Sequence, residues 1–179
     1  MSHFPFINQQ ILRSNLDLTF IHIIDLLALS ESESYKNKKA FVSSLRKTVV
    51  INTASIIEAL LLWKLKQVNK AKTIKLSNEW KYFEIKQIYK INDSQEAIAG
   101  LRKLEQKNID KLGFLRITDL CQKNNILRSG ALRKDIDKVR KLRNRMHIGG
   151  LKEIEKRYTN KDLELCFKVF KQIKKLSSK

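Results

Sequence analysis

Apolar residues recur every three to four positions along most of the chain, and that period predicts α-helices. The stretch FLRITDLCQKNNIL, for example, gathers its apolar residues on one side of a helix. Residues that can cap a helix precede several of these stretches, with Thr159 or Asn160 before the last one. In chain order, the predicted helices cover residues 15–29, 38–68, 94–110, 114–127, 131–147 and 159–176.

The second of these helices contains a segment, VVINTASIIEALLLWKL, that is apolar on nearly all sides. A helix of this kind is contacted on most of its faces, which places it at the centre of a bundle. Glu58 lies inside the segment, and the residues three and four positions away from it are small or apolar. The carboxyl group therefore shares a face with core residues.

Between residues 72 and 93 the pattern changes. Phe83, Ile85, Tyr89 and Ile91 alternate with charged or polar residues, which is typical of strands. We expect a short β-hairpin or an irregular arm there. The fold class predicted for residues 1–179 is a single all-α domain, a bundle of four to six helices with or without this inserted hairpin.

The composition agrees with an ordered helical protein and adds information about its partners. Of the 179 residues, 42% are hydrophobic, and only five are Gly and one is Pro. Lys and Arg number 37 against 18 Asp and Glu, which gives a net charge of +19. This imbalance indicates a polyanionic partner, nucleic acid being the commonest. A proteome that is rich in lysine would explain the same excess without any binding.

Cysteines and apolar segments bear on the compartment. Cys121 and Cys166 are far apart in the sequence, and each lies in a helical pattern of apolar residues. We interpret them as small buried hydrophobic residues of a protein in a reducing compartment. We expect no metal site and no cofactor, because no Cys/His cluster is present. The N-terminus carries no signal-peptide pattern, and the apolar run at residues 16–29 is too short and too polar to span a bilayer. The prediction is a cytoplasmic protein without a membrane segment.

The chemistry gathers in the stretch DKVRKLRNRMHIGG, residues 137–150. Arg140, Arg143 and His147 fall on one helical face, and Arg133 extends the row. Arginine grips phosphate with a planar fork, and histidine transfers a proton near neutral pH. Together they suit cleavage of RNA without a metal. The alternative is a basic helix end that complements the helix dipole.

The string VRKLRNRMHI resembles the terminal motif of the HEPN superfamily of small helical-bundle proteins, many of which are RNases of toxin–antitoxin, CRISPR and phage-defence systems. The signature is an Arg, four to six residues, then a His, commonly with a polar residue after the Arg. His147 matches the histidine, Arg140 matches the arginine by spacing, and Arg143 with Asn144 matches the dipeptide. NTASIIEALLLWKL is similar to the apolar second helix of the family, in which an acidic residue is common.

The resemblance implies a metal-independent endoribonuclease that works as a homodimer with a composite Arg/His cleft, as a toxin or anti-phage effector with a cognate antitoxin protein. It implies that Glu58 is a polar residue near the motif that orients the motif side chains. The other interpretation is that Glu58 lies at the edge of the buried helix. Only three residues separate Arg143 from His147, and Gly149 stands where some family toxins carry a modified tyrosine. These departures keep open a catalytically inactive module that binds RNA or protein. A DNA-associated protein driven by charge alone is a third interpretation.

Further RNA contacts are predicted beside the motif and in the arm. Trp80 and Lys81 belong to a run in which aromatic rings alternate with lysines, a composition that suits unpaired RNA. One packed face of a hairpin would show the same alternation. Of the other histidines, His22 is interpreted as a packed structural residue and His3 as part of a mobile N-terminus. The predicted RNA-binding residues are Arg133, Lys141, Arg145, Lys81 and Trp80.

Overall fold

The computed structural model describes residues 2–71, 74, 76, 78–106, 108–145 and 156–178. Its contacts divide the chain into two compact units, each of which is described by itself. The helical unit joins Met1–Gln67 to Gly113–Lys179, and the hairpin unit covers Val68–Leu112. That residues 1–179 form one domain therefore stays a prediction.

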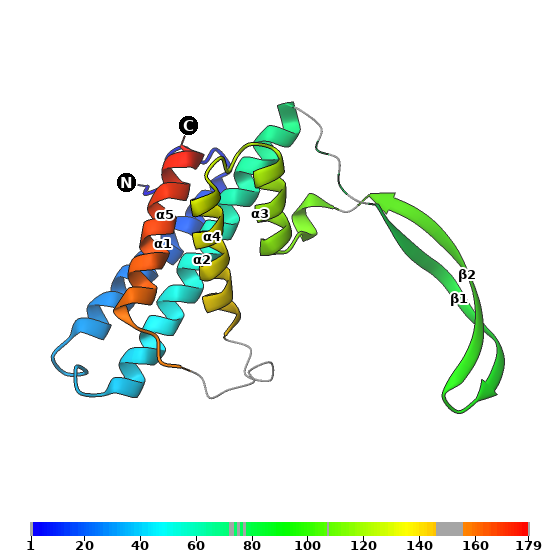
Figure 1. Ribbon diagram of the computed structural model, residues 1–179, viewed down its shortest axis with the longest axis horizontal. Helices are drawn as coiled ribbons and strands as arrows, with labels where there is room; N and C mark the ends of the chain where they lie inside the picture. The colour runs from blue at the N-terminus through cyan, green and yellow to red at the C-terminus, as the bar shows by residue number, and fades with distance from the viewer. Residues whose placement is uncertain are drawn as a thin grey trace. The chain divides into compact units, whose positions relative to one another are not determined.

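Five α-helices are present among the described residues (Figure 1), so the predicted helical bundle is confirmed. An antiparallel hairpin accompanies them, and the fold is therefore not strictly all-α. Within the bundle, α4 packs against both α3 and α5. The helices are α1 (Gln10–Glu31), α2 (Lys39–Ala71), α3 (Phe114–Lys123), α4 (Gly130–Asn144) and α5 (Asn160–Ser177), and the hairpin unit adds a 3₁₀ turn at Ile109–Lys111.

Helix α2 is the core helix, as its all-round apolar pattern predicts. Val49, Val50, Ile57 and Leu60 are fully buried, and together they cover several sides of the helix. By length and composition α2 could also cross a membrane, but a little over half of its apolar window is buried inside the protein, which is typical of a core helix. The remaining helices supply the partner surface, including Ile136 and Val139 of α4.

Helix boundaries differ from the predicted ones where packing or a cap decides them. Helix α1 begins at Gln10, five residues before the predicted start at residue 15. Helix α5 is capped by Thr159, one of the two predicted residues, in a reciprocal capping box with Asp162. Helix α4 ends at Asn144, three residues before the predicted end at residue 147.

The hairpin consists of β1 (Asn78–Asn92) and β2 (Gln95–Gln106). The prediction of a helix over residues 94–110 is therefore wrong. QEAIAGLRKLEQ is rich in helix formers, but pairing with β1 decides its conformation, since intrinsic propensity is a weak prior. The turn at Asp93 and Ser94 is closed by Asn92, whose Oδ1 accepts from the Ser94 N–H at 2.9 Å.

The two strands differ in regularity. The register shifts between Phe83 and Lys86, between Gln87 and Tyr89 and between Lys90 and Asn92, and each time the extra residue lies in β1. At the first bulge, Glu84 has a positive φ of 51°. Gly100 lies opposite this bulge, where a Cβ atom would come within 3.1 Å of the Phe83 carbonyl oxygen. Strand β2 thus stays regular along its length.

Both cysteines are buried and free, as predicted. Burial raises the pKa of the Cys121 thiol to about 12, and it raises the pKa of Cys166 to about 12 as well. The Cys121 thiol donates to the Leu61 carbonyl at 3.7 Å and so joins α3 to α2. These groups are packing elements of the bundle.

Candidate active site

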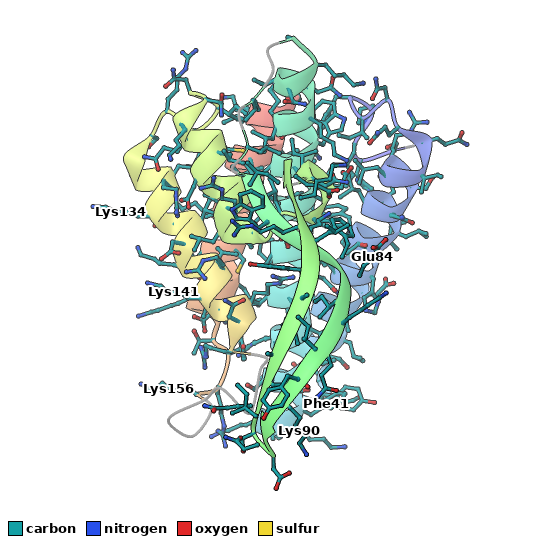
Figure 2. The ribbon with its side chains drawn as sticks, turned by 90° about the vertical axis from the view of Figure 1, so that its right-hand side faces the viewer. Phe41, Glu84, Lys90, Lys134, Lys141 and Lys156 are labelled. Atoms are coloured by element: carbon teal, nitrogen blue, oxygen red, sulfur yellow. The ribbon has the colours of Figure 1, made fainter. Side chains whose placement is uncertain are left out.

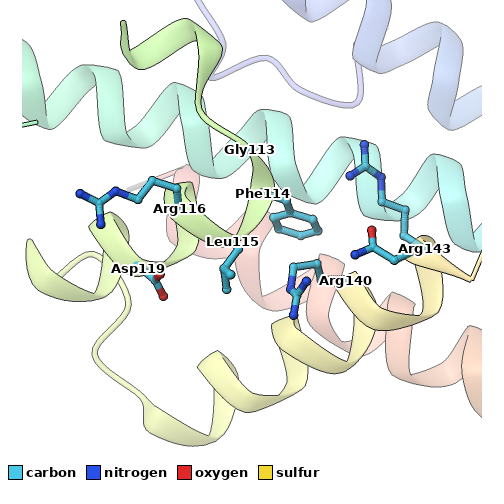
Figure 3. A pocket seen from close by; sticks show the side chains of 8 residues that line it. Gly113, Phe114, Leu115, Arg116, Asp119, Arg140 and Arg143 are labelled. Carbon is cyan, nitrogen blue, oxygen red and sulfur yellow. The ribbon is translucent and has the colours of Figure 1, made fainter. Parts of the chain in front are cut away.

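A pocket of about 370 Å³ lies between the first turns of α3 and the last turns of α4 (Figure 3). Helix α4 contributes Arg140, Arg143 and Asn144, which are three of the residues that the motif singles out. Figure 3 shows Arg143 extending toward α2. The complete lining is Gly113, Phe114, Leu115, Arg116, Asp119, Arg140, Arg143 and Asn144.

Local sequence explains why the arginines face this pocket. Helix α4 begins at a Ser129 cap, whose hydroxyl accepts from the Leu132 N–H. Ile136 and Val139 are fully buried and set the inner side of the helix. Arg143 follows Val139 by four residues, and so its stem lies on the same inner side.

Arg143 meets Glu58 of the core helix. Its Nη2 lies 3.4 Å from Oε2 of Glu58, and both side chains are largely buried, with 32% and 20% exposed. Burial raises the pKa of Glu58 above its usual value, and the positive charge of Arg143 opposes that rise. The structure thus places Glu58 beside the motif arginine, so that one acidic group from α2 orients the guanidinium at the pocket wall.

Arg140 is held on its own helix. Its Nε and Nη2 donate to Oδ1 of Asp137 at 2.9 and 2.7 Å. Lys141 approaches the other oxygen, Oδ2, at 3.0 Å. The Arg140 hydrogen bond, with that of Lys141, lowers the pKa of Asp137 below its usual value. A carboxylate one turn back therefore fixes the direction of the Arg140 fork.

Arg133, predicted to bind RNA, joins the two pocket helices. Its Nη2 lies 2.7 Å from Oδ1 of Asp119, and only 17% of its side chain is exposed. Its Nε is buried without a hydrogen-bond partner. Arg133 therefore holds Asp119 at the pocket wall and has little surface to offer a polyanion.

Arg145 and Lys141 lie at the end of α4. The Arg145 guanidinium stacks on the Tyr158 ring, with 4.6 Å between its Cζ and the ring centroid, and its Nη2 donates to the Lys156 carbonyl. The Tyr158 hydroxyl donates to the Leu142 carbonyl at 3.1 Å. Lys141 points outward from the helix, as does Lys134 on the same face two turns earlier (Figure 2). Of the two predicted contacts, Lys141 is the one that faces solvent.

His147 lies outside the described residues, together with the rest of residues 146–155. The segment that carries it starts directly after Arg145, and Arg145 contacts Lys156 on its far side. The described residues on its two sides, Arg145 and Lys156, therefore meet beside the last turn of α4. The position of the imidazole relative to Arg140 and Arg143 stays a prediction.

The other two histidines are placed away from the motif. His22 is exposed on α1, so the interpretation of a packed structural histidine is wrong. His3 donates its backbone N–H to Asp17 at 2.7 Å and packs its ring 4.7 Å from that of Phe20. The expected mobile N-terminus is instead packed against α1.

In the hairpin unit, Trp80 and Lys81 make local contacts. The Arg102 guanidinium lies over the Trp80 ring, 4.4 Å from its centroid. Lys81 pairs with Glu105 of the facing strand at 2.6 Å. The Trp80 and Tyr82 rings are half exposed or more, and both interpretations of this run stay predictions.

Three residues at the pocket were not predicted from the sequence. Arg116 and Asp119 line the pocket from α3, and Asp137 sets the direction of Arg140. The spacing of Arg116 and Asp119, three residues apart on an amphipathic helix, was the available signal. Among the residues that the structure describes, no group of three His, Cys, Asp or Glu side chains could hold a metal ion.

Comparison of the chain with protein-family models, with curated proteins and with solved structures finds no match.

Proposed function

We propose that this protein is a metal-independent endoribonuclease and that its site is the pocket between α3 and α4, completed by His147. The observation that supports this proposal is the convergence of Arg140, Arg143 and Asn144 on one pocket, at the helix end from which the chain continues to His147. The resemblance of VRKLRNRMHI to the HEPN motif agrees with it, and so does the net charge of +19.

In the proposed reaction, the RNA supplies its own nucleophile. The 2′-oxygen attacks the adjacent phosphorus, the bond to the 5′-oxygen breaks, and the products are a 2′,3′-cyclic phosphate and a 5′-hydroxyl. His147 transfers a proton, because the 2′-hydroxyl must lose one and the leaving oxygen must gain one. The guanidinium groups stabilise the negative charge that develops on the phosphoryl oxygens.

The proposal gives the two arginines different parts, and their ion pairs support this division. Arg140 is fixed by Asp137 on its own helix, and its fork is oriented before RNA arrives. Arg143 lies 3.4 Å from Glu58, a longer contact than the 2.7 Å hydrogen bond from Arg140 to Asp137, and burial raises the pKa of the Glu58 carboxyl group. We propose that Arg143 turns from Glu58 to the scissile phosphate, and that Arg140 is the fixed clamp.

A single motif histidine also bears on assembly. General acid and general base steps require two proton-transfer groups, and each chain offers one histidine at the motif. We propose a homodimer in which the two motifs face one another, with the toxin or anti-phage role and the cognate antitoxin protein that the resemblance implies, in the cytoplasm.

Expression in cells tests this function. We expect growth arrest and fragmented RNA with the wild-type chain, and neither with His147→Ala, because loss of an acid–base group costs about 10²-fold or more in rate. Lys134→Ala is the matched control, since it removes a positive charge from the exposed side of the same helix. Equal toxicity of wild type and His147→Ala would contradict the proposal.

A second function is favoured by the engagement of the arginines. Arg133, Arg140, Arg143 and Arg145 each contact a group of their own chain. Arginines used in this way suit a catalytically inactive module that binds RNA or protein. If the wild-type chain binds RNA but leaves it intact, this second function is the correct one.

A further inference from the structure

The hairpin exposes apolar side chains along its whole length. Large hydrophobic residues of both strands are 41–67% exposed. A two-stranded hairpin is marginally stable by itself in water, and three or more strands with a covered face are needed for independent stability. These residues are Trp80, Tyr82, Phe83, Ile85, Ile88, Tyr89, Ile91, Ile98, Leu101 and Leu104.

Charge separates the hairpin from the remainder of the chain. Residues 78–106 contain five basic and five acidic side chains, so their net charge is zero. The whole excess of +19 therefore belongs to the other residues. A neutral apolar ribbon suits a protein surface better than a polyanion, because phosphate contacts require an excess of Lys or Arg.

The two edges of the ribbon differ in their capacity to pair. Strand β1 carries all three extra residues and the positive-φ residue Glu84, which disrupt its outer edge. Strand β2 is regular from Gln95 to Gln106. The sheet has only these two strands in the described part of the chain, and so the outer edge of β2 presents backbone N–H and C=O groups that a further strand can pair with.

We propose that β2 pairs antiparallel with β2 of a second copy of this chain, so that Ala99 of one copy faces Ala99 of the other across the two-fold axis. The two ribbons then form one four-stranded sheet. In this register Glu96 of each copy lies opposite Arg102 of the other, on the face that also carries Ile98 and Leu104.

Charge complementarity selects this register. When a two-fold axis perpendicular to the sheet relates two antiparallel copies of a strand, both copies turn the same face to the same side. Residues that oppose one another therefore lie on the same face, and one residue faces its own copy across the axis. Among the registers that pair more than half of β2, only the one centred on Ala99 opposes side chains of opposite charge. Centring on Arg102 or on Lys103 would instead place that cation against itself. The Trp80 ring helps to hold the Arg102 guanidinium on the shared face.

This assembly does not depend on RNA cleavage, because a chain that cuts no RNA can still pair through β2. It also uses no residue of the pocket between α3 and α4. Its test therefore gives a result that is separate from the test of the ribonuclease.

Cysteine cross-linking of the full-length protein tests the register. Ala99→Cys places two thiols across the axis, and we expect rapid oxidation to a disulfide-linked dimer. Gln95→Cys is the matched control: its two copies would lie eight residues apart along the strands, about 27 Å at ~3.4 Å per residue, and we expect no cross-link. The native Cys121 and Cys166 are buried and do not interfere. Equal cross-linking at both positions would overturn the proposed register.

Charge reversal tests the same contact without cysteine chemistry. By sedimentation equilibrium, Glu96→Arg and Arg102→Glu should each raise the dimer dissociation constant on the order of tenfold, because two opposed pairs become like charges. The double variant Glu96→Arg/Arg102→Glu restores both pairs and should recover wild-type affinity. A double variant as weak as the single ones, or single variants as tight as wild type, would overturn the proposal. So would hairpin variants that lose RNA binding while their association is unchanged.

Discussion

Arg143 joins three parts of the candidate site: it is a motif residue, it lines the pocket, and it pairs with the core carboxyl of Glu58. Spacing alone placed Arg140 and Arg143 on one side of the helix, because helical period decides that geometry. Asp119 could not be assigned in the same way, because its contact with Arg133 depends on the packing of α3 against α4. Asp137 pairs with Arg140 within α4, at a spacing of three residues that is already present in the sequence.

The ion pairs predict how the carboxyl groups titrate. Removing Arg143 with Arg143→Ala should raise the pKa of Glu58 further, because burial remains and the opposing positive charge is lost. Arg140→Ala should leave Glu58 unchanged and raise the pKa of Asp137, whose value its hydrogen bond lowers. Each variant is thus the control for the other. NMR titration of carboxyl carbons measures both, and equal shifts of Glu58 in the two variants would contradict the assignment.

The raised pKa of Glu58 also determines how this group changes the folding free energy with pH. Because the pKa of Glu58 is raised in the folded state, its ionisation costs folding free energy once the pH exceeds the unfolded value, near 4.5. This carboxyl group therefore favours the folded state least above its folded pKa.

Among the helices and strands, the long segments with a clear helical period could be predicted from the sequence, whereas the conformation of strand β2 could not. Helix α2 and helix α4 have patterns that tertiary packing reinforces. Strand β2 carries Ala, Leu, Glu and Gln, which are helix formers, and its alternation is weak. Its conformation depends on β1, a non-local partner that a local pattern does not register.

The cap of α5 provides a stability test at this scale. Thr159→Ala removes the hydroxyl of the capping box with Asp162. We expect the free energy of unfolding to fall by about 1 kcal/mol, the usual cost of losing such a cap. Urea denaturation measures the change. Thr159→Ser is the control, because it keeps the hydroxyl and should retain most of the stability. A loss as large in Thr159→Ser as in Thr159→Ala would show that the hydroxyl contributes nothing.

For the whole molecule, the distribution of charge suggests a division of tasks. The neutral hairpin is assigned to self-association, and the residues outside it carry the net charge of +19. The alternative explanation of that charge, a lysine-rich proteome, predicts no functional consequence.

Salt dependence separates these explanations. If the basic residues contact phosphates, RNA affinity should fall steeply as salt rises, because each contact releases counterions, with a slope of about −0.7 per contact for single strands. Filter binding of labelled RNA to a His147→Ala chain, which should not cut it, measures the slope. An affinity that stays constant between about 50 and 200 mM salt would assign the charge to composition alone.

Incubation of purified protein with total RNA in EDTA, followed by end-group analysis of the products, is the most direct test of RNA cleavage at the pocket between α3 and α4. We expect cleavage by wild type and Lys134→Ala, products with 2′,3′-cyclic phosphate and 5′-hydroxyl ends, and a rate at least about 10²-fold lower for His147→Ala. Arg140→Ala and Arg143→Ala should also be slower, because Arg140 is proposed as the fixed clamp and Arg143 as the arginine that turns to the phosphate. Cleavage that EDTA abolishes, or a His147→Ala chain that cuts as fast as wild type, would contradict the account.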